Sequence, residues 1–430
     1  MLYPIVRPIA TLGLQVYFRK IYLAHPEHLP ADKPVILAAN HPTAFLEPCI
    51  LACFLEEPLY FLVRGDFFAN PFYSFLLRQL HMLPVFRKRD GRFSDLKNNF
   101  ATFEACFDAL RHNKTIMILA EGRTQYEKRL GPMQKGAARM AFGALNKYPE
   151  LEDVYVVPVG VTYTEVARMR SDVLISLGKP FSTRAFLEEY ERHPNEAATR
   201  FLDTLHARIA REMVIIPRPE DDELGELLLT VFRTSYRETL LPVVSEDDTR
   251  LRAEQQALLP LKEAAPAPEP LRQAAGTYQA LLDAHALRDA DVAGRARPKL
   301  IHGLLLGLGF PLYALGFLWN GPPLWLAQWI ATRYTNNLEF FASVKVSVGI
   351  FGWLFWFIGW WIAAALLGSP WWWALPLGML LSGLTALYYR DLGLWWLGRR
   401  RWNRLEPGAQ ADIRQARKRL VEAATRVHQT

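Results

Sequence analysis

The 430-residue sequence is poor in cysteine and lacks the motifs by which many enzymes hold a metal or a nucleotide. Its three cysteines, Cys49, Cys53 and Cys106, offer neither metal-binding spacing nor a plausible disulfide framework, so we expect reduced thiols on a cytoplasmic face. The sequence has no nucleophile elbow and no nucleotide-binding glycine loop, and His25 and His28 lie in a Pro-rich turn where we expect no partner carboxylates in a metal-binding pattern. We therefore expect neither a bound metal nor a resident cofactor.

The N-terminus lacks the small-residue cleavage site of a signal peptide, although it carries Arg7, Arg19 and Lys20. The chain also lacks a nucleic-acid-binding motif, so its net charge of +7 does not indicate a nucleic-acid partner. Basic residues flank apolar segments, and this arrangement favours an anionic membrane surface. We expect membrane lipid among the partners, and no nucleic acid.

Strand-like and helix-like segments alternate between residues 31 and 190. The expected strands are 35–39, 59–63, 115–120, 154–161 and part of 173–187, and the expected helices are 48–55, 71–80, 94–111 and 136–147. Such alternation predicts an α/β domain with a mostly parallel sheet flanked by helices. Ligands of such a domain should lie at the carboxyl ends of the strands.

The rest of the chain is expected to be helical or membrane-associated. Residues 1–30 contain an apolar, aromatic stretch at 4–24 that predicts a helix lying in the membrane interface. Residues 191–300 predict a charged helical region with a Pro/Ala linker near 264–270, and residues 391–430 predict a basic cytoplasmic tail.

Long apolar runs are concentrated after residue 300. Residues 346–367 and 371–389 are each long enough for one span and predict a transmembrane hairpin within 343–390. The apolar segment 301–331 is interrupted at 320–323 by Asn-Gly-Pro-Pro, and basic flanks on both sides of the whole region require an even number of crossings. We therefore expect 301–331 to be re-entrant or interfacial, with three full spans as the alternative. The chain is predicted to be a multi-pass membrane protein with its active site on the cytoplasmic face.

Two short polar segments, residues 40–47 and 121–125, each follow an apolar strand, and we call them the polar islands. His41 comes directly after strand 35–39, with Glu47 six positions later, and Glu121 and Arg123 follow strand 115–120. A histidine oriented by a carboxylate can act as a general base that removes a proton from a hydroxyl. A base in one loop and a Glu/Arg pair in another predict a single active site at the ends of the strands.

Several short motifs occur in a fixed order: Asn40-His41 with a following acid, Arg64-Gly65-Asp66, Leu83-Pro84-Val85-Phe86-Arg87, Glu121-Gly122-Arg123-Thr124 and Val157-Pro158-Val159. Over about residues 30–190 they resemble the four blocks of the glycerolipid acyltransferase family. The resemblance implies a membrane-bound enzyme that moves a fatty acyl group from acyl-CoA or acyl carrier protein to a glycerol-phosphate acceptor. It also implies direct attack by the acceptor hydroxyl, without a covalent acyl-enzyme.

The resemblance implies roles for seven residues. His41 would be the general base, Glu47 would orient it, and the acceptor would be bound by Arg87, Glu121, Gly122, Arg123 and Thr124. The family usually has aspartate at the position of Glu47, so the glutamate is a departure. Because Pro48 suits the first position of a helix, Glu47 is expected to be the N-cap, and aspartate is expected to replace it without loss.

The acceptor remains open among three glycerol phosphates. The spacing of five residues between His41 and Glu47 is similar to that of the fungal dual-specificity acyltransferases, so glycerol-3-phosphate or dihydroxyacetone phosphate is favoured over 1-acyl-glycerol-3-phosphate. The alternative from another class is a non-catalytic, lipid-binding membrane protein that keeps the fold.

Overall fold

The computed structural model describes residues 2–85, 98–235, 241–294, 300–368 and 374–426. These residues divide into two compact units. The first comprises residues 1–214, 240–251 and 331–346, and the second comprises 215–239, 252–330 and 347–430. Each unit is therefore built from segments that are far apart in the sequence.

The first unit is built on a mixed, mostly parallel sheet with the strand order β4-β3-β5-β2-β6-β7-β1-β9, and β8 pairs with β6. Only β7 and β8 pair with β6 in the antiparallel sense among the described strands. The strands are β1 Lys20–Ala24, β2 Val35–Ala39, β3 Leu59–Arg64, β4 Met82–Val85, β5 Thr115–Leu119, β6 Tyr155–Tyr163, β7 Asp172–Leu177, β8 Phe181–Ser182 and β9 Val244–Ser245.

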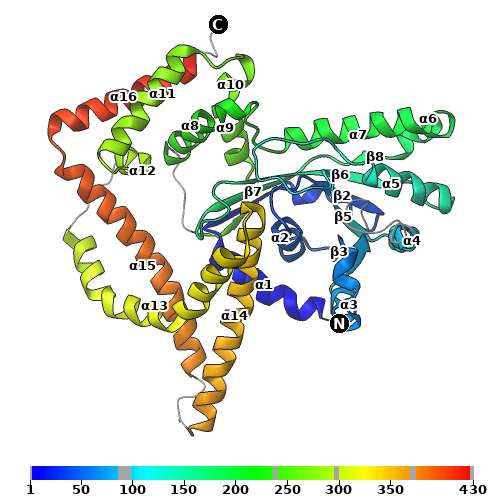
Figure 1. The fold of residues 1–430 in the computed structure, drawn as a ribbon, viewed down its shortest axis with the longest axis horizontal. Coiled ribbons are helices and arrows are strands. Elements are labelled where there is room, and N and C mark those ends of the chain that lie inside the picture. The colour runs from blue at the N-terminus through cyan, green and yellow to red at the C-terminus, as the bar shows by residue number, and fades with distance from the viewer. Residues whose placement is uncertain (1, 86–97, 236–240, 295–299, 369–373, 427–430) are drawn as a thin grey trace. The chain divides into compact units, whose positions relative to one another are not determined.

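Helices cover both faces of this sheet. Figure 1 shows α7 above the sheet and α1 and α2 below it. The helices of this unit are α1 Tyr3–Tyr17, α2 Leu46–Phe54, α3 Pro71–Gln79, α4 Asn98–Arg111, α5 Gly136–Lys147, α6 Leu187–Arg192 and α7 Pro194–Arg211. The central strand β2 is buried at every position, as expected for a parallel strand covered on both faces.

The register of the central strands brings the two polar islands together. Ala39, the last residue of β2, pairs with Leu119 of β5 on one side and with Val159 of β6 on the other. The loops that follow β2 and β5 therefore leave the sheet next to each other at its carboxyl edge. The predicted α/β fold class with a mostly parallel sheet is confirmed.

The expected interfacial helix at 4–24 is wrong in its second half. Helix α1 ends at Tyr17, and β1 is a strand whose five residues are all buried between β7 and β9. Its charged residues have partners far along the chain: Arg19 Nε donates to Asp172 Oδ1 at 3.0 Å, and Lys20 Nζ donates to the Pro242 carbonyl at 2.5 Å. The α/β unit therefore begins before residue 31.

The described elements of the second unit are helices, and the predicted charged helical region 191–300 is divided between the two units. Its helices are α8 Asp222–Ser235, most of α9 Thr249–Ala257, α10 Leu259–Glu263, α11 Glu269–Ala284, α12 Asp289–Ala293, α15 Ala374–Arg404 and α16 Pro407–Arg426. Buried acids tie these helices together. Asp289 accepts hydrogen bonds from Tyr278 at 2.5 Å and from Arg417 at 2.7 Å.

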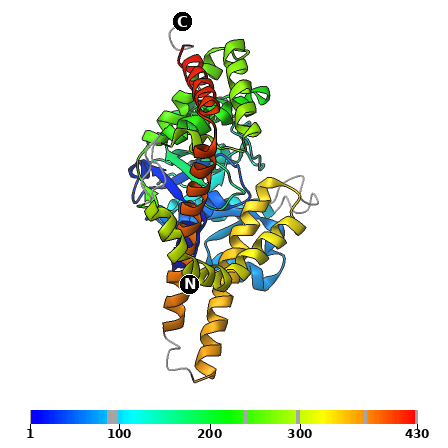
Figure 2. The same ribbon diagram turned by 90° about the vertical axis from the view of Figure 1, so that its left-hand side faces the viewer.

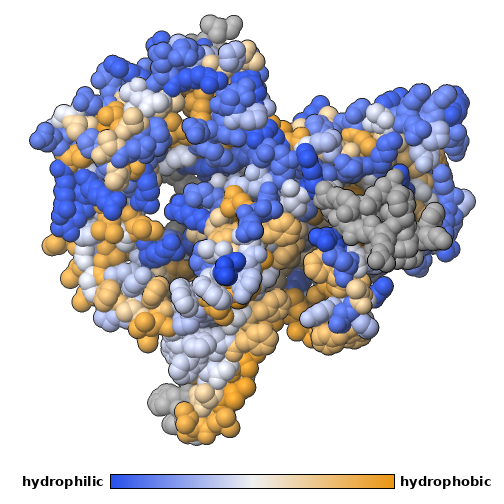
Figure 3. All heavy atoms as spheres, viewed as in Figure 1, coloured by the Kyte–Doolittle hydropathy of each residue, from blue (hydrophilic) through white to orange (hydrophobic). Residues whose placement is uncertain are grey.

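Two helices, α13 Leu300–Tyr334 and α14 Leu338–Leu366, are long and apolar enough to cross a membrane. Helix α15 begins beyond 369–373 and lies beside α14 in Figures 1 and 2, so the two form the predicted hairpin. In Figure 3 the protruding ends of these helices show hydrophobic residues, in orange, along one edge and at the tip, beside residues of intermediate hydropathy. That this hairpin crosses a membrane stays a prediction.

The expected break at 320–323 is not observed, because α13 continues through Pro322 and Pro323 and only bends (Figure 1). A proline within a helix leaves the carbonyl four residues earlier without its usual donor. For Pro323 this carbonyl belongs to Trp319, and the indole N–H of Trp356 donates to it at 2.8 Å. A neighbouring helix therefore supplies the missing hydrogen bond, and the helix persists.

Candidate functional site

His41 leaves the sheet directly after β2, and Asn40 fixes the point of departure. The Asn40 side chain donates to the Val161 carbonyl at 2.9 Å and accepts from the Val161 N–H at 2.7 Å. These two bonds extend the contact between β2 and β6 by one residue, through the side chain of Asn40 instead of its main chain. His41 therefore starts from a buried, rigid position and is itself only 4% exposed.

The loop after β5 holds the main chain of His41 from both sides. Glu121 Oε1 accepts from the His41 N–H at 2.8 Å, and the Gln125 N–H donates to the His41 carbonyl at 3.0 Å. The other oxygen, Glu121 Oε2, accepts from the Gly131 N–H at 2.9 Å. Burial raises the pKa of the Glu121 carboxyl although these bonds and Arg123 oppose it. Glu121 thus joins three segments of the site.

The His41 imidazole faces a hydroxyl. Its Nε2 lies 3.1 Å from Oγ1 of Thr124, which is hydrogen-bonding distance. A general base must reach the proton it removes at about this distance. The structure therefore brings His41, Glu121 and Thr124 together, as the sequence predicts.

The backbone conformation at position 122 requires a glycine. Its φ of +65° lies in the left-handed region, and a Cβ atom there would stand 2.6 Å from Cγ of Gln134. Both facts exclude a larger residue without rearrangement of the loop. The glycine shapes the turn between β5 and Thr124, whereas close approach to a ligand stays a prediction.

Glu47 is placed differently from the expectation. Helix α2 begins at Leu46, so Glu47 lies inside the first turn and is not the N-cap. Its Oε1 accepts from the Thr43 N–H at 2.6 Å and its Oε2 from the Thr43 hydroxyl at 2.9 Å, while that hydroxyl accepts from the Leu46 N–H at 3.1 Å. This reciprocal pattern resembles a capping box. Both oxygens of the Glu47 carboxylate therefore bond to Thr43.

The environment of Glu47 is dry. The carboxyl is fully buried, and burial raises its pKa to about 8 against the opposing hydrogen bonds from Thr43. The buried phenol of Tyr163 lies nearby, and its pKa is raised well above the ordinary value by burial and by the Glu47 carboxylate. The extra methylene of glutamate lets the carboxylate reach back to Thr43, which gives a structural reason for the departure from aspartate. Its role as an orienter of His41 stays a prediction.

Of the two arginines of the predicted acceptor site, the structure describes only Arg123. Arg123 is exposed at the tip of the loop after β5, and Arg87 lies outside the described residues. Arg64, at the end of β3, forms an exposed ion pair of 2.8 Å with Asp66. Binding of a phosphate by Arg87 and Arg123 therefore stays a prediction.

Sequence reasoning missed three contributors to the site. Thr43 organises the loop after His41, and Glu339 and Ser343 reach the same loop from the start of α14. Thr43 stands inside the recognised motif and has the side chain of a helix cap, so its signal was present. Glu339 and Ser343 stand at the start of an apolar helix in a distant part of the sequence, and no pattern there indicates a catalytic contact.

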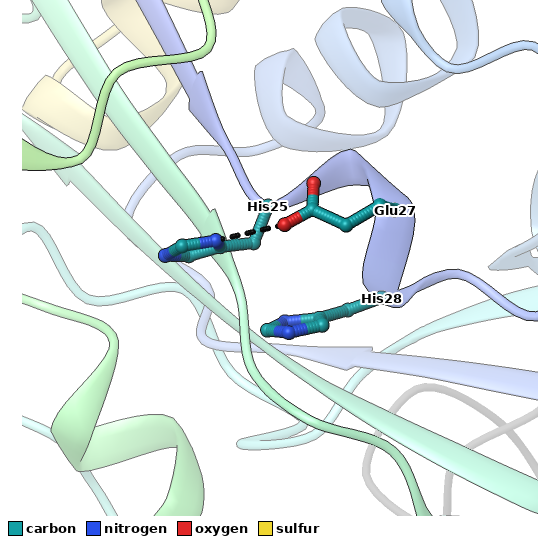
Figure 4. A group of neighbouring side chains, drawn as sticks. All are labelled: His25, Glu27 and His28. Carbon is teal, nitrogen blue, oxygen red and sulfur yellow. Dashed lines mark hydrogen bonds and ion pairs between the residues drawn. The ribbon is translucent and has the colours of Figure 1, made fainter.

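A second polar cluster lies beyond β1, where His25, Glu27 and His28 come within 4.8 Å of one another (Figure 4). His25 Nδ1 lies 3.0 Å from Glu27 and its Nε2 lies 3.2 Å from Asp248, so both ring nitrogens have carboxylate partners. Partial burial lowers the pKa of His25, but the two carboxylates outweigh it and raise the pKa overall. The expectation that these histidines lack partner carboxylates is therefore wrong, because Glu27 and Asp248 both contact the ring of His25.

Comparisons with known proteins match the part of the chain that carries the site. An acyltransferase family model covers residues 20–162. The chain is 26% identical over 153 residues to glycerol-3-phosphate O-acyltransferase 1 of Saccharomyces cerevisiae, which is 35% of this chain and 20% of that protein. It is 30% identical over 112 residues to glycerol-3-phosphate O-acyltransferase 2 of the same yeast, which is 26% of this chain and 15% of that protein.

The match therefore spans a fifth or less of the length of these relatives. Among solved structures, the 1-acyl-sn-glycerophosphate (LPA) acyltransferase of Thermotoga maritima aligns with 47% of this chain and 79% of that chain. The sequence identity is 18% and the TM-score is 0.33.

Proposed function

Because residues 20–162 match an acyltransferase family model and part of the chain is similar to two yeast glycerol-3-phosphate O-acyltransferases, we propose that the chain transfers a fatty acyl group to a hydroxyl of a glycerol-phosphate acceptor. The observation that carries the proposal is the His41 imidazole. It is buried, held through both of its peptide groups, and within 3.1 Å of a hydroxyl oxygen at the carboxyl edge of a parallel sheet. The donor would be acyl-CoA or acyl carrier protein, and the product would enter phospholipid synthesis.

In the proposed reaction His41 removes the proton of the acceptor hydroxyl as its oxygen attacks the thioester carbonyl carbon. An ester C–O bond forms, the C–S bond breaks, and the thiolate leaves with the proton from His41. The Thr124 hydroxyl marks a position from which a substrate hydroxyl would reach Nε2. Glu121 and Glu47 act by holding the segments on either side of the base.

Glycerol-3-phosphate is the favoured acceptor, followed by dihydroxyacetone phosphate and 1-acyl-glycerol-3-phosphate. The names of the two yeast relatives support the first choice, within the short segment that they share with this chain. Arg87 and Arg123 would bind the phosphate as charge-assisted partners. The enzyme would lie at a membrane through α14 and the helix that returns from it, with the sheet on the cytoplasmic side.

An acyl-transfer assay tests this function. The purified full-length protein is offered labelled acyl-CoA, and in parallel acyl carrier protein, with each of the three acceptors. We expect ester formation with at least one acceptor and its loss in His41→Ala. A folded protein that binds lipid but makes no ester with any donor and acceptor pair would favour the non-catalytic alternative.

A further inference from the structure

The loop that carries His41 is completed by a helix that lies outside the region matched by the family model. Residues 331–346, including the first turns of α14, belong to the same compact unit as the sheet. Within that unit the Ala44 N–H donates to the Glu339 carbonyl at 3.1 Å. The Phe45 N–H faces Oγ of Ser343 at 3.4 Å.

The second loop of the site is held from the same place. The Tyr126 N–H lies 3.5 Å from Oε1 of Glu339, and Tyr126 directly follows Gln125, whose N–H binds the His41 carbonyl. The start of α14 therefore contacts both peptide segments that flank the base. Farther along the helix, Lys345 Nζ donates to the Ala167 carbonyl at 3.1 Å and fixes α14 to the loop after β6.

These contacts satisfy groups that would otherwise lack partners. Ala44 and Phe45 precede α2, so their N–H groups have no acceptor within that helix. Ser343 is fully buried, and a buried hydroxyl is costly unless it takes part in hydrogen bonding. The start of α14 and the loop of His41 therefore form a hydrogen-bonded packing interface.

We propose that Glu339 and Ser343 are positioning residues for the acyl-transfer reaction, and that the start of α14 orders the loop which presents His41. This inference rests on the proposed function for its catalytic meaning. Because the same helix continues as a candidate membrane span, the order of the active-site loop depends on how α14 is positioned. A displacement of about 1 Å at a catalytic group can reduce a rate by about 10²-fold.

The test uses the full-length protein in lipid nanodiscs. The double variant Glu339→Ala/Ser343→Ala removes both side-chain contacts, and Glu339→Gln keeps an oxygen acceptor and serves as the conservative rescue. Ser347→Ala, one turn farther along the same helix, is the matched control. We expect kcat of the double variant to fall by roughly 10- to 100-fold with the KM values of donor and acceptor unchanged. Glu339→Gln and Ser347→Ala should stay within about twofold of wild type.

A second readout does not depend on activity. Hydrogen exchange at the amides of Phe45 and Tyr126, which face the two removed side chains, should accelerate in the double variant and not in Ser347→Ala, while the melting temperature stays close to that of wild type. A double variant with unchanged exchange and with kcat like that of Ser347→Ala would overturn the proposal. If the wild type transfers no acyl group but the exchange result holds, the function proposed above fails and the ordering role of α14 stands.

Discussion

At the scale of single residues, His41 is the group on which the chemistry depends. It is buried at the end of β2 and fixed by Glu121 and Gln125. We expect His41→Ala to lower kcat by roughly 10²–10⁴-fold, the usual contribution of a general base, with little change in melting temperature. His112→Ala is the control, because that exposed ring bonds to the Asp108 carbonyl of its own helix. Turnover in His41→Ala close to that of the control would remove the histidine from the mechanism.

Glu47 gives a prediction in which two substitutions act in opposite directions. If the carboxyl works by holding Thr43, Glu47→Gln keeps the length and an acceptor oxygen and should retain activity, whereas Glu47→Asp is too short and should lose it. A role as the charged orienter of His41 requires the reverse order, with Gln inactive and Asp active. The contacts with Thr43 favour the first order, whereas the sequence leads to the expectation that aspartate is tolerated. Steady-state kinetics of the two variants decide between these roles.

The protonation of Glu47 can be followed through stability. Its folded pKa of about 8 lies above its ordinary value of 4.5, so the stability from the neutral carboxyl is fully present below about pH 4.5 and is lost as the pH rises through about 8. Glu47→Gln cannot titrate. We expect its melting temperature relative to wild type to increase between pH 5 and pH 8.5. A constant difference across this range would mean that Glu47 is ionised throughout.

Thr124 stands where a nucleophile would stand, because its hydroxyl is 3.1 Å from the candidate base. The proposed mechanism has no acyl-enzyme, so Thr124→Ala should retain a substantial part of kcat, and Thr124→Ser should be close to wild type. Mass spectrometry of the protein quenched during turnover should find no added acyl group. An acylated peptide containing Thr124 would establish covalent catalysis instead.

At the scale of elements, the turn after β1 is held by ion pairs whose strength depends on the protonation of His25. His25 lies between Glu27 and Asp248, and its pKa is raised above 6.5, so the ion pairs are fully formed below about pH 6.5 and are lost as the pH rises through the folded pKa. Because the Glu27 carboxylate is exposed and solvent screens these ion pairs, their contribution to stability is small. Asp248→Asn should lower the melting temperature at pH 6 and have little effect at pH 9. The exposed neighbour Glu246→Gln should have little effect at either pH.

The central elements were predictable because they depend on local patterns. Strand β2 and helix α5 have the bounds that apolar runs and turn residues indicated. Strand β1 was missed because Arg19 and Lys20 make the segment look amphipathic. In the structure these charges are satisfied by Asp172 and the Pro242 carbonyl, and such distant partners leave no trace in a local pattern.

The site was likewise predictable where it depends on local sequence patterns. Its loop residues follow strands directly, so His41, Glu121 and Thr124 were found together, as expected from the parallel sheet. The partner of Glu47 was not predicted, because a choice between His41 and Thr43 depends on the path of a short loop. The contacts from α14 depend on the arrangement of the whole unit.

At the scale of the whole molecule, contacts within each unit constrain how the chain crosses a membrane. Glu339 holds the start of α14 beside the loop of His41, and the Asp291 carbonyl, next to the start of α13, accepts from Arg399 near the end of α15 at 2.5 Å. If α14 and α15 each cross once, both ends of α13 lie on the side of the sheet. Helix α13 then re-enters or lies along the membrane, although its length and composition would allow a span.

Cysteine labelling in sealed vesicles tests this topology. Single cysteines are introduced at Glu152, Gln279 and Lys418 in a chain whose three native cysteines are replaced by alanine. We expect an impermeant reagent to reach all three positions from the same side. Labelling of Gln279 only from the side opposite Glu152 would show that α13 crosses the membrane.

The division of the first unit into three stretches also sets the order of events during synthesis. The family match ends at residue 162, but the unit is not complete until residue 346 has been made. At about 5–20 residues per second the ribosome needs roughly 10–40 s for that interval, during which α13 has already emerged. We expect limited proteolysis of ribosome-bound chains to find residues 41–45 protected when synthesis is stalled at 400 but not at 300. The catalytic loop would then become ordered only once the apolar helix is available, so the enzyme would mature where it works.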